Sequence, residues 1–518
     1  MTAPAILLAL LALGGATLAP LFPWVAPLEA QSASSGAPRP LSLAEALSLA
    51  GASSENVALA KAGVDRARGQ YGQARSALLP QISTTVQWQK QLQNQFAALT
   101  SRAGDSGTGG GGGTGSDTSA ADNPITRIFA SQYNFNLGLT ASQPLFTGGR
   151  AVAGIRAARL AQESANLGIS SAEAQVQLDV TSAYYDAVLA ERLATIADST
   201  LVQAERTLRQ VQLTRDVGNT SEFELIRARV TRDNQRPALL QARTGRELAL
   251  VRLRQLLDLP ADQALVLTDS IAESALPTAA APSTAAITTV NVDATSVLAP
   301  DPRVTGEVSR LVASSDTSNK SRTAVQQARK NVEIAQQNLR ATRGQRLPQI
   351  SATTNYQRLA YPQNVLPTAL NDFLPNWTVG IGLSLPIFSG GNVSGQIQAA
   401  EAGVVEARQR LKLTEEGATF DSRQATLQLA EAEATWQASI GTAEQAQRAY
   451  DIAEVRFREG ISTQLELSET RVQLQQALAN RARAARDLQV ARKRLALLPY
   501  LPLSAAQQAA PLNTGMSR

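Results

Sequence analysis

Four short segments of the chain alternate strictly between apolar residues and polar or small ones: residues 82–89, 133–140, 350–357 and 377–384. A period of two predicts β-strands. One face of each strand is apolar and the other is uncharged. Two interpretations follow: a soluble sheet with one face on a core, or a membrane barrel wall, apolar toward lipid and polar toward a water-filled lumen. In the second interpretation, the aromatic residues at the membrane interfaces are Trp88, Tyr133, Tyr356 and Trp377.

The lengths of these strands favour the membrane interpretation, because each is close to the about 9–11 residues that a tilted membrane strand needs. Long, loop-like stretches separate the strands of each pair, at residues 93–131 and 360–376. Four strands are too few to close a barrel, since even small barrels take about eight. Lipid does not tolerate open sheet edges, so the wall must be shared between subunits.

Helical periodicity begins directly after the second strand of each pair. Apolar or small residues then recur in alternating steps of three and four, which is the heptad seam of a coiled coil. In the first half of the chain the seam is Val180, Ala183, Ala187, Ala190, Ala194, Ala197, Leu201, Ala204, Leu208 and Val211. Residues 150–216 and 392–459 therefore predict two helices of about 100 Å. Shorter helices are predicted over 55–78, 223–258, 323–346 and 465–497.

The pattern of predicted strands and helices occurs twice in the sequence. The stretch from Pro144 to Gly149 returns from Pro386 to Gly391, an offset of 386 − 144 = 242, whereas Pro80 returns as Pro348, an offset of 268. The difference of 26 residues lies between residues 83 and 143, which include a Gly-rich run. Such self-similarity predicts one architecture built twice. Its strand-to-helix junctions are Pro144, Gly148, Gly149, Pro386, Gly390 and Gly391.

The chain is accordingly divided into two repeats and their flanks. The first repeat is expected to hold a short first helix, a second helix, two strands, a long helix, a tip turn and a shorter helix. A stretch rich in Pro, Ala, Ser and Thr separates the two repeats. The expected parts are a signal peptide at 1–30, the first repeat at 31–274, the linker at 275–302, the second repeat at 303–500 and a disordered C-terminal tail at 501–518.

The apolar stretch at residues 6–13 predicts an export signal, since it is too short to span a bilayer. No Lys or Arg precedes it, which is unusual for a signal peptide. No other segment has the uninterrupted apolar length of a transmembrane helix, so membrane insertion must use the strands.

Composition and charge exclude several function classes. The chain contains neither Cys nor His, which removes thiol nucleophiles, Ser-His triads, His metal ligands and disulfides. The net charge is +5, but Arg is interspersed with Asp and Glu along helical faces. A solvated helix surface is therefore favoured over nucleic-acid binding. No cofactor is expected.

Two glycine-containing turns reverse the chain between a long helix and a shorter one. Gly218 and Gly460 supply the left-handed conformation that ends a helix. Ser221, and Ser462 or Thr463, can cap the helix that follows. For the fold alone, these are ordinary turns between antiparallel helices.

Taken in order, these residues resemble the outer-membrane efflux protein (TolC-like) family. The resemblance rests on the Leu-Ser-Leu-Ala-Glu-Ala-Leu segment from Leu41, Leu-Pro-Gln-Ile at two strand starts, the duplicated Pro-Leu/Ile-Phe-Thr/Ser-Gly-Gly junction and the glycine turns, and it covers residues 41–497. It implies a mainly α fold with a membrane β-barrel: four strands per subunit form a homotrimeric 12-stranded barrel in outer-membrane lipid, continued by an α-helical periplasmic tunnel. It also implies passive export with an inner-membrane pump and a periplasmic adaptor (membrane fusion) protein.

The resemblance assigns roles to the two tips. The adaptor-docking residues would be Gly218, Asn219, Thr220, Ser221, Gly460, Ile461, Ser462 and Thr463. The family carries paired acids after the glycine of the second tip, and Glu466 and Glu469 fill those positions. Their spacing places both carboxylates on one helix face, so three subunits would form acidic rings that favour cations.

The first copy has Glu224 at the matching position, but Arg227 where the second acid would be. We therefore include Glu224 and Arg227 with Glu466 and Glu469 in a candidate periplasmic gate. Arg227, or Arg215 and Arg458 beside the glycines, is hypothesised to pair with the acids and hold the tip closed. The alternative is that the acids belong to an ordinary solvated helix face.

Two other function classes compete with an export channel. A periplasmic coiled-coil scaffold or adaptor without a pore would explain the helices but not the amphipathic strands. A membrane-anchored hydrolase is opposed by the lack of His, Cys and any catalytic motif. The Gly-rich run lacks the Lys-Ser/Thr of a phosphate-binding loop.

Overall fold

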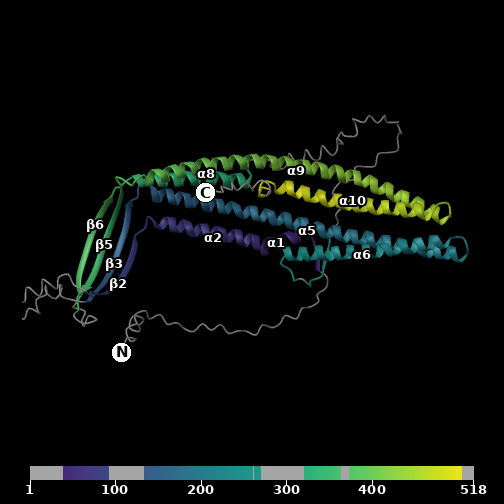
Figure 1. Ribbon diagram of the computed structural model, residues 1–518, viewed down its shortest axis with the longest axis horizontal. Coiled ribbons are helices and arrows are strands. Elements are labelled where there is room, and N and C mark those ends of the chain that lie inside the picture. Colours follow the sequence, from purple (N-terminus) through teal and green to yellow (C-terminus); the bar gives the residue numbers. More distant parts are fainter. Residues whose placement is uncertain (1–38, 93–132, 261, 270–319, 363–372, 504–518) are drawn as a thin grey trace, which may run out of the picture.

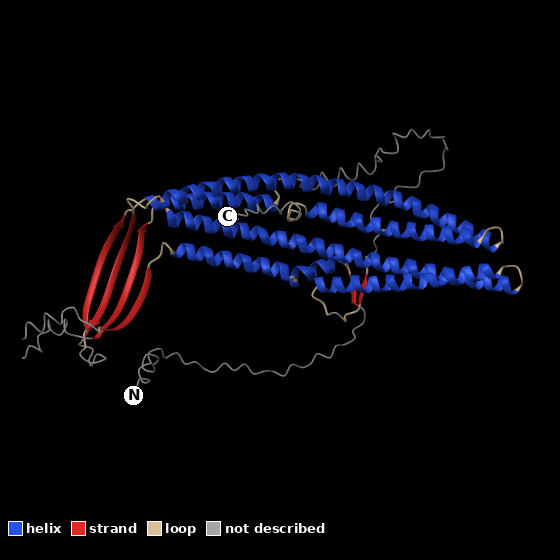
Figure 2. Cartoon of the chain, in the orientation of Figure 1, coloured by secondary structure: helices blue, strands red, loops and turns tan. Residues whose placement is uncertain are grey.

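The structure is a computed structural model that describes residues 39–92, 133–260, 262–269, 320–362 and 373–503. A four-stranded sheet lies at one end of the elongated chain, and long helices extend from it to two turns at the opposite end (Figure 1). Figure 2 shows this division into a bowed sheet and a helical body.

The four alternating segments form one antiparallel sheet, as predicted. Its strands follow the order β2 (Gln81–Lys90), β3 (Tyr133–Phe146), β5 (Gln349–Ala360) and β6 (Phe373–Ser384). Among the described residues, β2 and β6 are each paired on one side only, so the chain by itself forms an open sheet. The trimeric 12-stranded barrel therefore stays a prediction.

The long helices have the predicted extent. Helices α5 (Arg150–Asp216) and α9 (Asn392–Arg458) contain 67 residues each, which corresponds to about 100 Å. Beside the sheet they pack against α2 (Glu55–Ser76) and α8 (Thr323–Arg343), and in the far half against α6 (Glu222–Leu256) and α10 (Gln464–Leu497) (Figure 1).

The duplication is reproduced in the element boundaries. Both ends of α5 become those of α9 when 242 is added, since 150 + 242 = 392 and 216 + 242 = 458. The start of α2 becomes that of α8 when 268 is added, since 55 + 268 = 323. The additional residues of the first copy lie between β2 and β3, in the interval that the sequence predicted.

The core consists mainly of small side chains along the predicted seam. Eight of the ten seam residues of α5 are buried, and Ala190 and Leu201 are partly buried. Because alanine dominates, the helix axes can approach closely without large side chains between them. Midway along the body, Tyr184 lies in the largest buried apolar cluster.

A small structure formed by the two ends of the first repeat lies beside this cluster. Helix α1 (Leu43–Ser53) begins after Ser42, whose hydroxyl accepts from the Glu45 N–H at 3.2 Å and caps the helix. Strands β1 (Arg39–Leu41) and β4 (Leu265–Leu267) form a parallel pair that the sequence did not predict. The Tyr184 hydroxyl donates to the Leu41 carbonyl at 3.0 Å and ties this pair to α5.

Part of the predicted domain organisation lies outside the described residues, namely 1–30, 275–302 and most of 501–518. The start of the predicted disordered tail is ordered, because Leu501 and Leu503 are buried. Leu503 packs with Val325 and Ala418 between α8 and α9, so apolar contacts hold the chain three residues into that range. In the part of the chain that the structure describes, no helix is long and apolar enough to cross a membrane.

Candidate functional site

The two predicted tips have the same backbone geometry. Gly218 has φ 83° and Gly460 has φ 73°, the left-handed conformation expected after a helix. The N–H of Asn219 donates to the Thr214 carbonyl at 2.9 Å, and the N–H of Ile461 donates to the Arg456 carbonyl at 2.8 Å. Each turn therefore satisfies a carbonyl at the end of the preceding long helix.

The helices that leave the tips are capped by hydroxyl side chains. Ser221 accepts from the Glu224 N–H at 3.3 Å, as predicted. In the second tip, Thr463 rather than Ser462 is the cap, because its hydroxyl accepts from the Glu466 N–H at 3.4 Å. Thr220 instead bonds to Thr214 across the first turn at 2.9 Å.

The two acids of the candidate gate differ in their surroundings. Glu466 is half-buried and lies 3.7 Å from the Arg456 guanidinium. Glu469 is exposed, one turn further along α10, and within the described residues it forms no ion pair.

Two of the three arginines of the closing hypothesis, Arg215 and Arg458, bind other groups within the chain. Arg215 lies 2.9 Å from Glu222 and 3.3 Å from Asp216, and these contacts, with the Asp216 hydrogen bond first, raise the pKa of its guanidinium. Arg458 pairs with Glu454 at 3.7 Å. The partner of Glu466 is Arg456, which the sequence analysis did not consider. Helix geometry explains why Arg458 pairs with Glu454 and not with Glu466, since Arg458 and Glu454 are four residues apart on one helix face.

Gln464 joins the two helical hairpins near their tips, a contact that sequence reasoning missed. With its side-chain amide oriented so that each atom meets a complementary partner, the Gln464 nitrogen donates to the Glu224 carbonyl oxygen at 3.0 Å and to the Glu224 carboxylate at 2.6 Å, and the amide oxygen accepts from the Ala228 N–H at 3.0 Å. The side chain is only 4% exposed. Glu224, a predicted gate residue, is therefore held by α10 of its own chain.

Apolar contacts reinforce this connection. Phe457 of α9 packs against Leu225 and Ala228 of α6 in one cluster and against Leu467 of α10 in another. The two hairpins thus share one aromatic side chain. Predicted gate residue Arg227, on the adjacent α6 surface, is half-buried.

At the opposite end, paired glycines shape the strand-to-helix junctions. Gly148 and Gly149 have φ 63° and 79°, and Gly390 and Gly391 have φ 60° and 83°. The Thr147 hydroxyl accepts from the Ala151 N–H in the first turn of α5 at 3.2 Å. Pro144 lies in β3 beside a register shift, where its missing N–H removes no regular pairing, and Pro386 follows the end of β6.

The position of Gly148 also explains why residue 344 is a glycine, which the sequence analysis did not single out. A Cβ atom on Gly148 would overlap the Gly344 carbonyl oxygen, and a Cβ on Gly344 would overlap that of Gly148. The two backbones touch where α8 ends and α5 begins. Sequence reasoning missed this contact because the residues are far apart in the chain.

The predicted interface aromatics gather toward the end of the sheet far from the helices. Trp88 and Tyr133 stack with ring centroids 6.0 Å apart, and Tyr356 lies directly opposite Trp377 in β5 and β6. Trp88 and Tyr356 are each eight residues beyond the proline that precedes their strand. They are therefore at one level of the sheet, about 25 Å from the junctions.

Comparison with protein families decides the assignment of the chain. A family model described as outer membrane efflux protein matches residues 46–258 and 315–498, well over half of the sequence. The chain belongs to the outer membrane efflux protein family. Membership supports a role as an outer-membrane efflux channel and agrees with the resemblance seen in the sequence. The proteins of this family are channels rather than enzymes.

Solved structures of outer membrane channels share this fold at low sequence identity. The CmeC channel of Campylobacter jejuni has a TM-score of 0.66 and 16% identity, over 90% of this chain and 87% of that one. VceC of Vibrio cholerae has a TM-score of 0.63 and 16% identity, over 88% and 96%. The open state of MtrE from Neisseria gonorrhoeae has a TM-score of 0.61 and 17% identity, over 89% of each chain. None of the curated proteins compared with the chain matches it.

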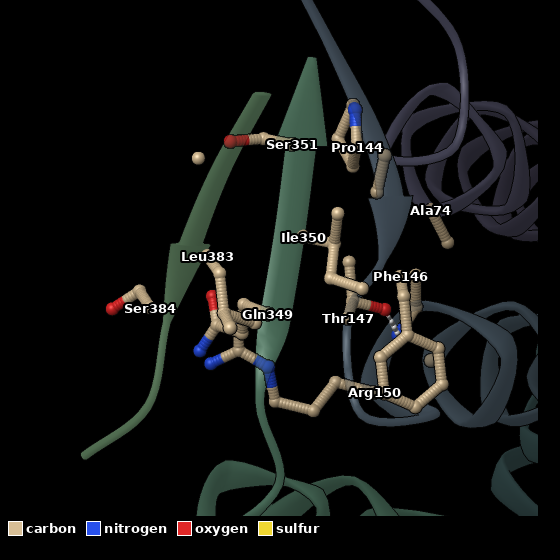
Figure 3. Close-up of a pocket in the computed structure, with 14 residues that line it drawn as sticks. Ala74, Pro144, Phe146, Thr147, Arg150, Gln349, Ile350, Ser351, Leu383 and Ser384 are labelled. Carbon is tan, nitrogen blue, oxygen red and sulfur yellow. Dashed lines mark hydrogen bonds between the residues drawn. The ribbon is translucent and has the colours of Figure 1, made fainter. Parts of the chain in front are cut away.

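A pocket of about 730 Å³ lies at the first junction of this efflux-family fold (Figure 3). It is mainly apolar, and its cation Arg150 donates to the Gln349 side-chain oxygen at 3.0 Å. Within the described residues, no group of three or more acidic, His or Cys side chains is placed to hold a metal ion. The pocket therefore offers a surface for apolar groups.

A buried charge cluster holds the helical body together near α8. The Asp421 carboxylate accepts from Arg322 at 2.6 Å and from Arg494 at 3.1 Å, and both Arg322 and Asp421 are buried. Asp179 and Arg252 occupy the matching positions of the first copy, since 421 − 242 = 179 and 494 − 242 = 252. There, burial raises the pKa of Asp179, against the Gln175 hydrogen bond and the charge of Arg252. This repeated Asp–Arg spacing is the sequence signal that could have found the cluster.

Burial also affects one cation close to the second tip. Arg471 of α10 is 4% exposed, and burial lowers the pKa of its guanidinium, with Tyr450 acting in the opposite direction. Within the described chain it forms no ion pair, and its Nε has no hydrogen-bond partner. A buried cation therefore lies two residues beyond the exposed Glu469.

Proposed function

We propose that the protein is the outer-membrane channel of a tripartite efflux or type I secretion system. Three copies would join their sheets into a 12-stranded barrel in outer-membrane lipid, and their helices would form a tunnel through the periplasm. An inner-membrane pump and a periplasmic adaptor would deliver substrates, which the channel conducts passively to the exterior.

One observation carries the proposal: an amphipathic sheet with two free edges continues directly into helices of about 100 Å. The apolar face suits lipid and the uncharged polar face suits a water-filled lumen. A scaffold or adaptor without a pore would need the helices but has no use for such strands.

The tips are proposed to serve two roles. The turns from Gly218 to Ser221 and from Gly460 to Thr463 would dock the adaptor, because they lie at the end of the body farthest from the sheet (Figure 1). Glu466 and Glu469 would form acidic rings in the trimer that select cations at the periplasmic mouth, with Glu224 and Arg227 on the neighbouring helix.

Conductance in planar bilayers tests both parts. Purified protein is expected to form cation-selective pores, and Glu466→Ala combined with Glu469→Ala should reduce cation selectivity and block by divalent cations. Glu444→Ala, which removes an exposed acid of α9 away from the tip, should leave both unchanged. A folded oligomer that conducts no ions would refute the channel and favour the scaffold, whereas unchanged selectivity in the double variant would refute the gate alone.

A further inference from the structure

The two hairpins of the sheet have the same register. In the first, Gln81 pairs with Ser142. Adding the offsets gives 81 + 268 = 349 and 142 + 242 = 384, and Gln349 does pair with Ser384 in the second hairpin. The duplication therefore preserves strand pairing residue by residue, so a pair observed in one position predicts its counterpart in the other.

The two hairpins of the sheet contact each other once within the chain, where β3 pairs with β5. In it, Gly138 lies opposite Gln357, Leu139 opposite Tyr356 and Leu137 opposite Arg358. These are a glycine with a long amide, an aliphatic residue with an aromatic one, and an aliphatic residue with a cation.

The counterparts of these six residues lie on the two free edges. The same offsets convert the pairs into Gly380 with Gln89, Ile381 with Trp88 and Val379 with Lys90. Each counterpart pair has the chemistry of the original. One member is on β6 and the other on β2, at opposite edges of the sheet, so the pairs cannot form within one chain.

We infer that β6 of one subunit pairs antiparallel with β2 of the next, with Ile381 opposite Trp88 of the partner subunit. Gly380 then lies opposite the partner's Gln89. This inference rests on the proposed function, which supplies the oligomer, and it defines the register in which the copies join. The occupant of each free edge is a second copy of this chain.

The alternation of the strands supports this register independently. Ile381 belongs to the apolar face of β6 and Trp88 to the apolar face of β2. The register derived from the repeat therefore places apolar face beside apolar face. A slip of one residue would put Ile381 opposite Gln87 or Gln89 and reverse one face throughout the strand.

Exposure at the second junction supports the same contact. Phe146 of the first copy pairs with Ile350 and is 44% exposed. Its counterpart Phe388 is 89% exposed, and the counterpart of Ile350 is Ile82 on the free edge of β2. Pairing of Phe388 with Ile82 of the partner subunit would reduce the exposure of Phe388 toward that of Phe146.

The helices beside the sheet follow the same relation. Where α8 meets α5, Lys330 lies 2.8 Å from Glu163 and the Gln327 side chain donates to the Ser164 carbonyl. The counterparts of Lys330 and Glu163 are Ala62 and Val405, and those of Gln327 and Ser164 are Leu59 and Glu406. Leu59 is 69% exposed and Val405 is 55% exposed. Between subunits, Ala62 of α2 would thus meet Val405 of α9 where the internal contact is the Lys330–Glu163 ion pair.

Disulfide cross-linking tests the register, and only the introduced cysteines of the chain can react because its own sequence contains none. The full-length chain carrying Ile381→Cys and Trp88→Cys is oxidised in its membranes and separated on a denaturing gel. Cross-linked dimers and trimers are expected, because directly opposite Cα atoms lie within disulfide distance. Val379→Cys with Lys90→Cys, from the neighbouring pair, provides a second test if loss of Trp88 impairs folding.

Two further cysteine pairs serve as controls, one within the chain and one shifted in register. Leu139→Cys with Tyr356→Cys should close within one chain, because these residues pair across β3 and β5. Ile381→Cys with Val86→Cys keeps both residues on the apolar face but shifts the register by two. It should cross-link at least tenfold more slowly than the matched pair, since diagonal neighbours lie farther apart.

The outcomes separate the register from the function. Conducting trimers in which the shifted pair reacts faster, or in which only the internal pair reacts, would overturn the inferred register and leave the channel intact. A chain that neither associates nor conducts would refute the proposed function together with the inference. Fast cross-linking of both matched pairs between subunits would support the register.

Discussion

Replacing Gln464 by leucine is expected to loosen the contact between the two helical hairpins near their tips. Leucine is similar in size, so the packing against α6 is largely kept while the amide is lost. The amide nitrogen lies 3.0 Å from the Glu224 carbonyl and 2.6 Å from its carboxylate, and the amide oxygen lies 3.0 Å from the Ala228 nitrogen. The substitution removes all three hydrogen bonds in a place where the side chain is 4% exposed.

The size of the effect follows from burial. A buried polar group left without its partner costs about 1–3 kcal/mol. Taking about 2 kcal/mol for the contact, the equilibrium between joined and separated hairpins shifts roughly 30-fold toward separation. Backbone amides in the first turns of α6, Ala228 above all, should then exchange with solvent on the order of 30 times faster.

Hydrogen exchange of the peptide covering residues 222–232 measures this directly, in the detergent-solubilised full chain. Gln473→Leu is the matched control, because Gln473 is exposed on the same helix. If residues 222–232 are as well protected from exchange in the Gln464→Leu variant as in the Gln473→Leu variant, the Gln464 amide does not hold the hairpins together. Conductance of the same variants then shows whether the contact also restrains the tip.

Three further expectations concern stability, measured by thermal or urea unfolding in one detergent. Gly344→Ala should lower stability by about 1–3 kcal/mol because its Cβ meets backbone, whereas Gly395→Ala in open space should raise it by about 0.5–1 kcal/mol; equal effects of the two would refute the close approach. Lys330→Met should cost at most about 1 kcal/mol at neutral pH, as its partner Glu163 is part-exposed. The Lys330 hydrogen bond lowers the pKa of Glu163, so the stability difference between the Lys330→Met variant and the original protein should disappear as pH falls below the usual carboxyl pKa. A stability difference that persists at low pH would contradict this assignment. Burial raises the pKa of Tyr184 to about 12, so stability should fall between about pH 10 and pH 12, and Tyr184→Phe should flatten this slope.

Much of the fold could be predicted because it depends on local patterns. Period-two alternation located the four strands of the large sheet, and the heptad seam located α5 and α9 to within a residue or two. The left-handed conformation at Gly218 and Gly460 follows from the freedom that glycine alone has at low cost. These features need only neighbouring residues, so they can be read without knowing what packs against them.

The candidate site was predicted less completely. Glu466 and Glu469 were placed on one helix face, and the caps at Ser221 and Thr463 were among those expected. The partner of Glu466 was not found, because Arg456 lies on a different helix from the acid. Which arginine reaches it depends on the rotation of α9 about its axis, and an alanine-rich seam leaves that rotation open until the neighbouring helices are in place.

The sequence by itself determined the repeated unit, its element boundaries and the chemistry of each strand face. Only the tertiary structure decided which distant residues meet: Gly148 with Gly344, Gln464 with Glu224, and Asp421 with Arg322. The physical reason is that periodicity and glycine turns act over a few residues, whereas these contacts join residues about 100–240 positions apart and form only when helices pack at close range.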